Sequence, residues 1–436
     1  MYHFIGIKGS GMSALAQIMN SLGIDVQGSD VDKHFFTEEG LIKNGIKIYE
    51  FNKENIKKNL KIVQGNAFNE NNNEEVKRAK ELNLEIITYQ EMVGKISKMF
   101  KTICIAGCHG KTTTTAMLSH VLNDITGCNY LIGDGTGYAN KKNKYFALES
   151  CEYKRHFLSY FPSYSIITNI ELDHVDYYKD LDDVIAAYQS FINKTSKTAI
   201  LNGDDENVKK LKFDKKIIYY GLNEENNVVA KNIIYSENGI EFDVFIDNKF
   251  IKKFNLNLYG NHMLMNALAV ITVCYLEKLD MEKVKNSLRT FKGAKRRFSE
   301  TKVLDNVVID DYAHHPTEVL ATINSAKQKY PNKKIIAVFE PHTFSRTIEF
   351  QKDLIKVLKK CDKVYIMDIY GAREKQEDYP EITYHIIADK IENCENISRN
   401  EANKLLKHNN SVILFMSPND LSTLENDYIN LKLSDN

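Results

Sequence analysis

The segment A-G-C-H-G-K-T-T-T, residues 106–114, contains glycines, one lysine and three threonines. It follows an apolar run and opens a predicted helix. Backbone amides in such a turn can surround phosphate oxygens, Lys111 can bring positive charge to β- and γ-phosphates, and the Thr112 hydroxyl can ligate magnesium. The general phosphate-loop pattern has glycine where Ile105 stands, so the match is partial, and a strand–helix turn with a chance lysine is the alternative. We predict that this segment binds nucleotide phosphates.

Acidic side chains follow two further apolar runs. Glu149 comes directly after one, and T-N-I-E-L-D-H, residues 168–174, comes after the next, and we expect the two strands to be neighbours. The carboxyl ends of strands are where α/β sheets bind ligands. Carboxylates and a histidine such as His174 can hold magnesium. Each segment alone could be a solvated charged loop, but beside a phosphate loop they predict magnesium-assisted phosphoryl transfer.

A second glycine turn, G-I-K-G-S-G, occupies residues 6–11. Glycines there let the backbone approach a pyrophosphate at a helix N-terminus. Asp30 lies about 20 residues further on, where an acid often holds a ribose hydroxyl. The spacing is not the G-x-G-x-x-G of typical NAD folds. A pyrophosphate-containing ligand is our prediction, and a dinucleotide or a tight turn needed only for packing are the alternatives.

Basic and histidine-rich segments gather in the last third of the chain: F-K-G-A-K-R-R-F at residues 291–298, D-D-Y-A-H-H-P-T-E at 310–318 and F-E-P-H-T-F-S-R-T at 339–347. Arginines can stabilise a transferring phosphoryl group or clamp a carboxylate. The histidine pair before Pro316 can instead serve only to cap a helix.

The elements that must position these residues alternate between strand and helix signals, which is typical of α/β architecture. Antiparallel strands are expected within 228–258 and a surface loop at 66–75. The expected strands are Tyr2–Ile7, Thr102–Ala106, Phe146–Leu148, Ser165–Thr168, Val303–Ile309, Lys334–Phe339 and Lys363–Met367, and the expected helices are Gly9–Leu22, Lys111–Leu122, Asn261–Lys278, Pro316–Lys329 and Phe350–Lys359.

Length and composition limit the class of protein. The 436 residues suggest about three domains, with linkers near 97–101 and 293–298. Acidic and basic residues balance at 58 each, so no overall field favours nucleic acid or a membrane surface. The seven scattered cysteines indicate reduced thiols in a cytosolic protein. We find no signal-peptide pattern and no apolar run long enough for a membrane span.

Taken in order, these motifs resemble the Mur ligase family over nearly the whole chain. They are joined by G-I-K-G-S-G-M-S-A-L-A, E-S-C-E-Y and G-N-H-M-L-M-N-A-L-A. The resemblance implies a Rossmann-like UDP-sugar domain at 1–99, a central ATP-binding domain at 100–297 with a mainly parallel sheet and a small antiparallel one, and a C-terminal Rossmann-like domain at 298–436.

The activity implied is an ATP- and Mg²⁺-dependent ligase. It would join L-alanine to the carboxylate of UDP-N-acetylmuramate through an acyl phosphate, in peptidoglycan precursor synthesis. It would be a cytoplasmic monomer or homodimer without nucleic-acid or membrane partners. A sibling ligase adding another amino acid or peptide, a nicotinamide-dependent oxidoreductase and a non-catalytic nucleotide-binding scaffold are the alternatives.

Residue roles carry over motif by motif as implications of the resemblance. The catalytic residues are Lys111, His174, His314 and Arg346, with His342 beside them. The ATP-binding residues are Gly107, Cys108, His109, Gly110, Lys111, Thr112, Thr113, His262, Asn266, Arg297 and Asp311. The UDP-sugar residues are Gly6, Gly9, Ser10, Gly11, Met12, Ser29 and Asp30. The magnesium ligands are Thr112, Glu149 and His174.

Several positions depart from the family pattern. Cys108 stands where threonine is usual, Ser150 and Cys151 replace an Ala-Asp pair, and Met263 replaces a frequent asparagine. A cradle of backbone amides tolerates the first change. Related ligases use a carbamylated lysine, and the corresponding stretch here reads A-Y-Q-S at residues 187–190, so none is predicted.

Overall fold

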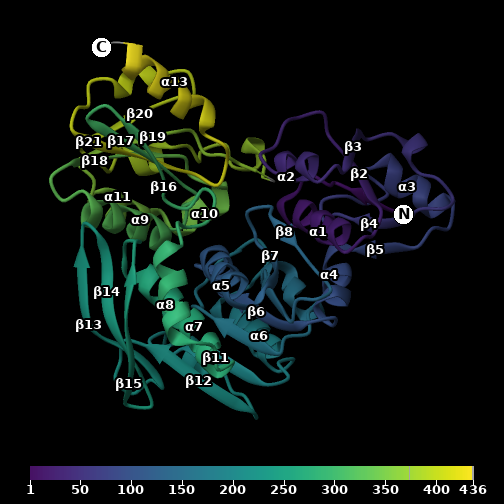
Figure 1. Cartoon of the computed structure of the whole chain (residues 1–436). Coiled ribbons are helices and arrows are strands. Elements are labelled where there is room, and N and C mark those ends of the chain that lie inside the picture. Colours follow the sequence, from purple (N-terminus) through teal and green to yellow (C-terminus); the bar gives the residue numbers. More distant parts are fainter. Residues whose placement is uncertain (373, 435–436) are drawn as a thin grey trace.

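Three sheets form the frame of the computed structural model, which describes residues 1–372 and 374–434 (Figure 1). The first sheet is parallel and has the order β3-β2-β1-β4-β5. Its strands are β1 (Tyr2–Ile5), β2 (Val26–Asp30), β3 (Lys47–Glu50), β4 (Lys61–Gln64) and β5 (Ile86–Thr88), and its helices are α1 (Ser10–Ser21), α2 (Glu38–Lys43), α3 (Glu74–Glu81) and α4 (Tyr89–Ser97).

The second sheet has the order β15-β14-β13-β12-β11-β10-β6-β9-β7-β8. Strands β6 to β13 pair mainly in parallel, and β13, β14 and β15 pair antiparallel. The strands are β6 (Lys101–Ala106), β7 (Cys128–Leu131), β8 (Gly137–Tyr138), β9 (Tyr145–Glu149), β10 (Tyr164–Ile167), β11 (Thr198–Asn202), β12 (Lys216–Gly221), β13 (Val228–Ser236), β14 (Gly239–Ile246) and β15 (Lys249–Leu256).

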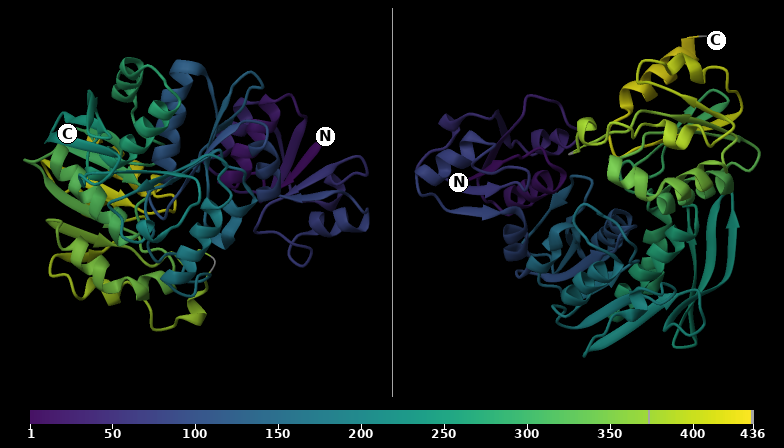
Figure 2. Two further views of the ribbon diagram at one scale, coloured as in Figure 1. Left: turned by 90° about the horizontal axis from the view of Figure 1, so that it is seen from below. Right: turned by 180° about the vertical axis from the view of Figure 1, so that it is seen from behind.

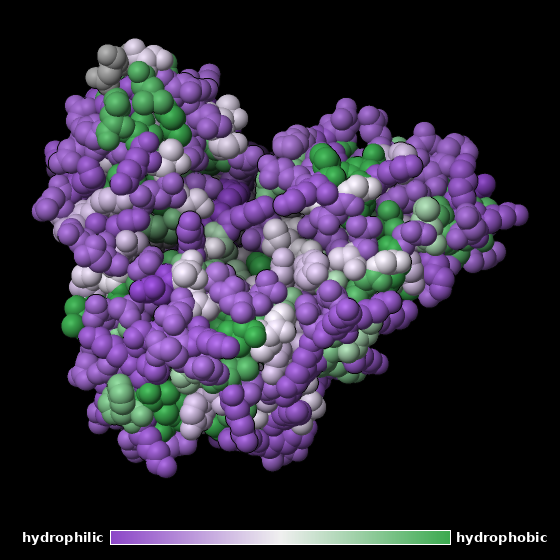
Figure 3. All heavy atoms as spheres, in the orientation of Figure 1, coloured by the Kyte–Doolittle hydropathy of each residue, from purple (hydrophilic) through white to green (hydrophobic). Residues whose placement is uncertain are grey.

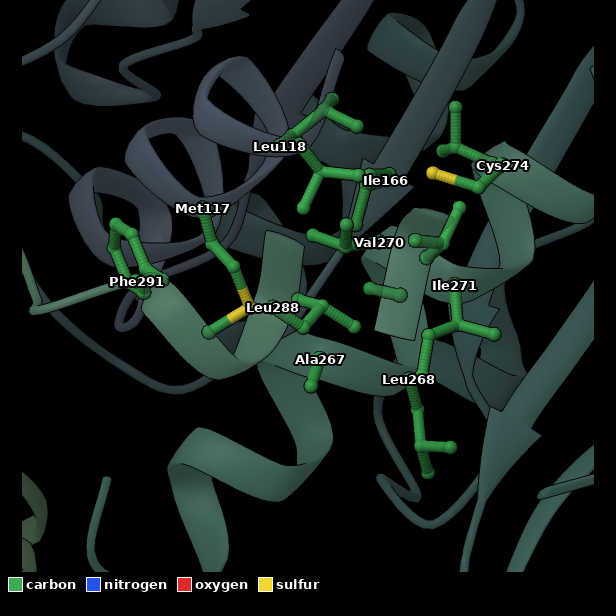
Figure 4. Packing of buried hydrophobic residues seen from close by; sticks show 14 of the residues in the cluster. Met117, Leu118, Ile166, Ala267, Leu268, Val270, Ile271, Cys274, Leu288 and Phe291 are labelled. Carbon is green, nitrogen blue, oxygen red and sulfur yellow. The ribbon is translucent and has the colours of Figure 1, made fainter. Parts of the chain in front are cut away.

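Four helices cover this central sheet: α5 (Lys111–Thr126), α6 (Leu181–Ile192), α7 (Asn261–Leu276) and α8 (Met281–Thr290). Helices α5, α7 and α8 share one apolar core with the sheet (Figure 4). Met117 and Leu118 of α5, Val270 of α7 and Leu288 of α8 are fully buried in it. Each such side chain contributes about 1.5–3 kcal/mol when removed from water. This packing holds α5, and with it the phosphate loop, firmly on the sheet.

The third sheet has the order β16-β17-β21-β18-β19-β20, with β16 antiparallel at its edge. Its strands are β16 (Ser299–Val303), β17 (Asn306–Asp311), β18 (Lys334–Phe339), β19 (Lys363–Ile366), β20 (Cys394–Asn396) and β21 (Ser411–Met416). Its helices are α9 (Pro316–Lys329), α10 (Phe344–Glu349), α11 (Gln351–Leu358), α12 (His385–Ala388) and α13 (Ser422–Ser434).

The predicted three-domain α/β fold is confirmed, and two local predictions are wrong. The single strand expected at 303–309 is a hairpin, because Leu304 with φ 55° makes the turn between β16 and β17. The surface loop expected at 66–75 ends inside α3, where the Glu75 side chain is fully buried. The Glu75 carboxylate can be buried because Asn52, Asn55 and Ser29 donate hydrogen bonds to it. The proposed domain boundaries at 99/100 and 297/298 stay predictions.

The domains of the first and third sheets both border the central domain (Figure 2). The Gln17 amide of α1 donates to the Gly135 carbonyl, and Gln328 of α9 donates to the carbonyls of Ser236 and Gly239. The face shown in Figure 3 is mostly hydrophilic, with a notch between the N-terminal and C-terminal domains. Within residues 1–372 and 374–434, no helix has the length and apolar character needed to cross a membrane.

Candidate active site

The phosphate loop joins β6 to α5 and is held in a fixed shape. Gly107 has φ 141° and Gly110 has φ 82°, conformations that favour glycine, and a Cβ at Gly107 would collide with the Thr168 hydroxyl. The Thr168 hydroxyl donates to the His109 carbonyl at 2.6 Å, and the His109 amide donates to the Asn169 side chain at 2.8 Å. These hydrogen bonds fix the shape of the loop, with the N-terminus of α5 facing the space above it.

Lys111, the first residue of α5, points back along the loop. Its ammonium donates to the carbonyls of Gly107 and Cys108, at 2.6 and 3.1 Å, and lies 3.0 Å from the Glu152 carboxylate. Burial alone would lower the pKa of Lys111, but Glu152 and the other groups around the ammonium together raise it above its usual value. The lysine therefore stays charged.

Thr112 and Glu149 lie side by side, as a shared metal site requires. The Thr112 hydroxyl donates to Glu149 Oε1 at 2.9 Å, and the Gly133 amide donates to Oε2 at 2.6 Å. Burial raises the pKa of Glu149 in the protein without a cation, so the carboxylate gains from any positive charge that reaches it. This hydroxyl and carboxylate are the oxygen ligands that Mg²⁺ prefers.

A cavity of about 270 Å³ opens beside the loop, between the central and C-terminal domains. Most of the predicted ATP residues line it. His262 and Asn266 come from the first turns of α7, Arg297 from the connection into the third sheet, and Asp311 from the end of β17. Burial, followed by the nearby Arg297, lowers the pKa of His262 to about 4, so its imidazole is neutral at pH 7. Burial raises the pKa of Asp311 to about 6.

A second cavity, of about 430 Å³, lies on the other side of the loop and receives residues from all three domains. It brings together the four predicted catalytic residues and the three predicted magnesium ligands: Lys111, His174, His314, Arg346, Thr112 and Glu149, with His174 in both groups. Ser10 from the N-terminal glycine turn also lines it. A substrate bound at the N-terminal domain could thus reach the phosphate loop through this cavity.

The far wall of this cavity comes from the C-terminal domain. Arg346 of α10 donates to Asp173 at 2.6 Å and approaches His342 Nδ1 at 2.8 Å. The His314 ring lies 5.3 Å from the His342 ring, centre to centre. Burial lowers the pKa of His314 to about 4, so it is neutral at pH 7.

His109 of the phosphate loop contacts residues of the central domain and of the C-terminal domain. Its Nε2 lies 3.5 Å from Glu171, and its Nδ1 lies 3.3 Å from Glu318 of α9. Burial alone would lower the pKa of His109, but these two carboxylates raise it to about 10. Burial and the neighbouring His109 charge lower the pKa of His315 to about 4. His315 also caps α9, since its Nδ1 accepts a hydrogen bond from the Thr317 amide at 3.3 Å. Helix capping was the alternative role for the pair His314 and His315, and it applies to His315.

In the N-terminal glycine turn the structural demands differ from residue to residue. A Cβ at Gly6 would meet the Phe68 ring and one at Gly11 would meet Tyr89, whereas one at Gly9 would make only ordinary contact. Gly6 and Gly11 are therefore needed for packing, and Gly9 is not. Met12 is buried under the turn.

The predicted nucleoside-side residues are engaged within the domain. The Asp30 carboxylate accepts from the amides of Lys8 and Val31, at 2.7 and 2.8 Å, and so braces the turn. The Ser29 hydroxyl is buried against Glu75 and His3. A ligand-binding role for Ser29 and Asp30 stays a prediction.

Sequence reasoning missed two residues of this site and misplaced one relationship. Glu152 and Asp173 stand inside the motifs but received no role, since an acidic letter in a loop does not reveal its partner. Strands β9 and β10, which lead to Glu149 and His174, were expected to be neighbours, yet β6 lies between them. Both still reach the same cavity because their carboxyl ends flank the phosphate loop.

Three models of protein families match the chain, in the order of the three sheets: the Mur ligase family catalytic domain at residues 1–101, the Mur ligase middle domain at 105–274, and the Mur ligase glutamate ligase domain at 296–418.

Solved structures are similar over almost the full length. UDP-N-acetylmuramate-alanine ligase MurC from Thermotoga maritima is 26% identical, with a TM-score of 0.83 and coverage of 100% of this chain and 99% of that one. A murein peptide ligase from Psychrobacter arcticus is 23% identical, with a TM-score of 0.74 and coverage of 99% and 98%. MurF ligase from Thermotoga maritima, solved with ADP, is 16% identical, with a TM-score of 0.67 and coverage of 88% and 98%. The last two likenesses concern the fold alone.

Proposed function

Because this chain belongs to the Mur ligase family, whose members are ATP-dependent ligases of peptidoglycan synthesis, we propose that it joins L-alanine to UDP-N-acetylmuramate. The observation that carries this proposal is the match to the Thermotoga maritima alanine ligase, at 26% identity over the full length of both chains. The three family models match one after another along the chain. The 430 Å³ cavity that all three domains line supports it independently.

In the proposed reaction, the muramate carboxylate attacks the γ-phosphate of ATP, ADP leaves, and an acyl phosphate forms. The alanine amine then attacks the acyl carbon, and phosphate departs. A carboxylate oxygen is a poor leaving group, and phosphorylation makes it a good one. The amine must lose a proton before or during its attack. The site contains two neutral imidazoles that could accept this proton, those of His314 and His262. His314 lines the cavity where the two substrates would meet, so its position makes it our candidate proton acceptor.

The chain's own groups would act on charge and position. Lys111 and the amides of the phosphate loop neutralise the phosphoryl oxygens, and Arg346 adds positive charge from the opposite wall. His262, Asn266, Arg297 and Asp311 would hold the nucleotide in the 270 Å³ cavity. The N-terminal turn would hold the pyrophosphate of the UDP-sugar. An acyl phosphate hydrolyses readily, so closing the C-terminal domain over the cavity protects it from water.

Magnesium fits the residues present, since Thr112 and Glu149 offer a hydroxyl and a buried carboxylate in contact, with His174 on the same cavity. When bound, it would neutralise phosphate charge and polarise the γ-phosphoryl group. We also propose that the protein is cytoplasmic, where its precursor substrates would be found. All seven cysteines are free, as expected in a reducing compartment.

The test is phosphate release with ATP, UDP-N-acetylmuramate and one amino acid at a time. We expect turnover with L-alanine well above that with glycine, L-serine or D-glutamate. Faster turnover with a tripeptide would identify a sibling ligase and contradict the alanine assignment. Binding of NADH without binding of the UDP-sugar would contradict the ligase assignment itself.

A further inference from the structure

A buried carboxylate links two residues that we have placed at the reacting centre. Glu152 is only 1% exposed. Its Oε2 lies 3.0 Å from Lys111 Nζ, and its Oε1 lies 3.1 Å from the same nitrogen and 3.5 Å from His174 Nε2. We infer that Glu152 is a positioning residue, which holds the Lys111 ammonium and the His174 imidazole in register for phosphoryl transfer. This inference deepens the proposed function and rests on it.

Lys111 needs such a partner because its ammonium has three protons to direct. Two of them are donated to the carbonyls of Gly107 and Cys108, within the loop itself. The third points to Glu152, so the carboxylate decides which way the charged group leans. Without it, the lysine would be free to turn toward the incoming phosphates or away from them.

The backbone is strained close to Glu152, in the turn that positions its side chain. Lys154 and Arg155, the second and third residues after Glu152, have φ of 51° and 58°. Left-handed backbone conformations are strained for non-glycine residues. External contacts hold the turn: Arg155 donates to Asp183 at 2.5 Å, and the Tyr178 hydroxyl donates to the Glu152 carbonyl at 2.5 Å. Strain kept by contacts on both sides is expected where one side chain must be placed accurately.

The charge of Glu152 also faces the nucleotide phosphates across Lys111. The Glu152 carboxylate lies 3.0 Å from the Lys111 ammonium, a contact that favours its ionised form. An ionised carboxylate weakens the attraction of the site for ATP while it fixes the groups that act in the transition state. A residue that only stabilises the fold would show no such opposition between binding and turnover.

The experiment replaces Glu152 in the full-length enzyme and measures nucleotide binding and turnover separately. Binding is measured by calorimetry with the non-hydrolysable analogue AMP-PNP and Mg²⁺. For Glu152→Gln we expect about fivefold tighter binding, because a like charge is lost, and about 100-fold lower kcat, because Lys111 and His174 lose their register. Glu152→Asp keeps the charge but shortens the reach, so binding should stay near the wild-type value while kcat recovers in part.

Glu277 supplies the matched control. It is 4% exposed and bonds Lys101 and Tyr164, so it is another buried carboxylate paired with a lysine, at the opposite end of β6 from the loop. Glu277→Gln should lower the melting temperature and leave kcat and AMP-PNP affinity unchanged.

Three outcomes would overturn the inference: kcat of Glu152→Gln within threefold of wild type, a parallel loss of kcat and affinity with no more than the thermal destabilisation of Glu277→Gln, or recovery of kcat at high Mg²⁺, which would make Glu152 a metal ligand. The binding measurement needs no UDP-sugar. If wild-type enzyme does not ligate alanine, yet Glu152→Gln binds AMP-PNP more tightly and loses its residual ATP hydrolysis, the proposed function fails and the role of Glu152 stands.

Discussion

The Arg346 guanidinium donates a 2.6 Å hydrogen bond to the Asp173 carboxylate across the boundary between the C-terminal and central domains. Both side chains are buried, at 8% and 9% exposure. Asp173 immediately precedes His174, which lines the 430 Å³ cavity. We therefore expect the position of His174 to depend on where the C-terminal domain sits.

Breaking this pair tests that dependence. Arg346→Ala leaves a buried carboxylate without its partner, so we expect a loss of about 3 kcal/mol in the free energy of unfolding and a large drop in turnover. Asp173→Asn in the same background should add little, because the pair is already broken. Urea unfolding of the two single variants and the double variant measures the coupling, and simple additivity would show that the contact carries no energy.

Lys111→Ala removes the charge that faces the transferring phosphoryl group. We expect turnover to fall by about 3 kcal/mol of transition-state stabilisation or more, with an unchanged far-UV circular dichroism spectrum. Steady-state phosphate release measures the effect. Turnover within threefold of the wild-type value would remove Lys111 from the mechanism.

The proposed magnesium ligands are tested by the Mg²⁺ requirement of their variants. Glu149→Ala and His174→Ala should each raise the Mg²⁺ concentration needed for half-maximal activity and lower turnover, since each removes one group from the cation's surroundings. Glu282→Ala, on the exposed ion pair with Lys252, is the control and should titrate like wild type. An unchanged Mg²⁺ dependence in both site variants would exclude the pair as ligands.

Gly9 separates ligand binding from packing in the N-terminal turn. Apart from its chain neighbours, a Cβ at this position would have only the Gly6 carbonyl oxygen within 4 Å, at 3.6 Å. Gly9→Val should therefore fold normally, abolish binding of UDP-N-acetylmuramate and leave ATP affinity nearly intact. Isothermal titration with each ligand measures this. Normal binding of the UDP-sugar by the variant would place its pyrophosphate elsewhere.

The His109 contacts predict a pH dependence of stability. Because the folded pKa, about 10, lies above the unfolded value of 6.5, the contribution of His109 is fully present below pH 6.5 and is lost as pH rises toward 10. The distances of 3.3 and 3.5 Å are long for hydrogen bonds, so we expect at most a few kcal/mol. The difference in melting temperature between wild type and His109→Gln should shrink over this range. A constant difference would mean that His109 is neutral throughout.

Sequence patterns predicted most of the fold because the strands leading to the site are short apolar runs bounded by glycines and charges. Helix α9 was predicted with both ends correct. Its start was marked by Pro316, because proline is favoured at the first position of a helix. The hairpin of β16 and β17 was not, because a left-handed leucine at residue 304 has no signature in sequence.

The site itself could be predicted only as a set of motifs. Glu152 and Asp173 act through partners 41 and 173 residues away in sequence, and no local pattern encodes such pairs. The same limit applies to Glu75, whose burial depends on hydrogen-bond donors from β2 and from the segment after β3. Periodicity reports which face of an element is apolar, not which charged groups meet across domains.

The order of strands also bears on how the protein is made. Every strand of the first sheet lies before residue 89, so that domain can fold as soon as its own segment has left the ribosome. The central sheet cannot, because β6 pairs with β9 and β10 on its two sides and its covering helix α7 ends only at Leu276. During that interval β6 and the phosphate loop are exposed beside a finished neighbour. The α1 surface that later receives the β7–β8 turn is then the first native surface that the emerging chain can dock against.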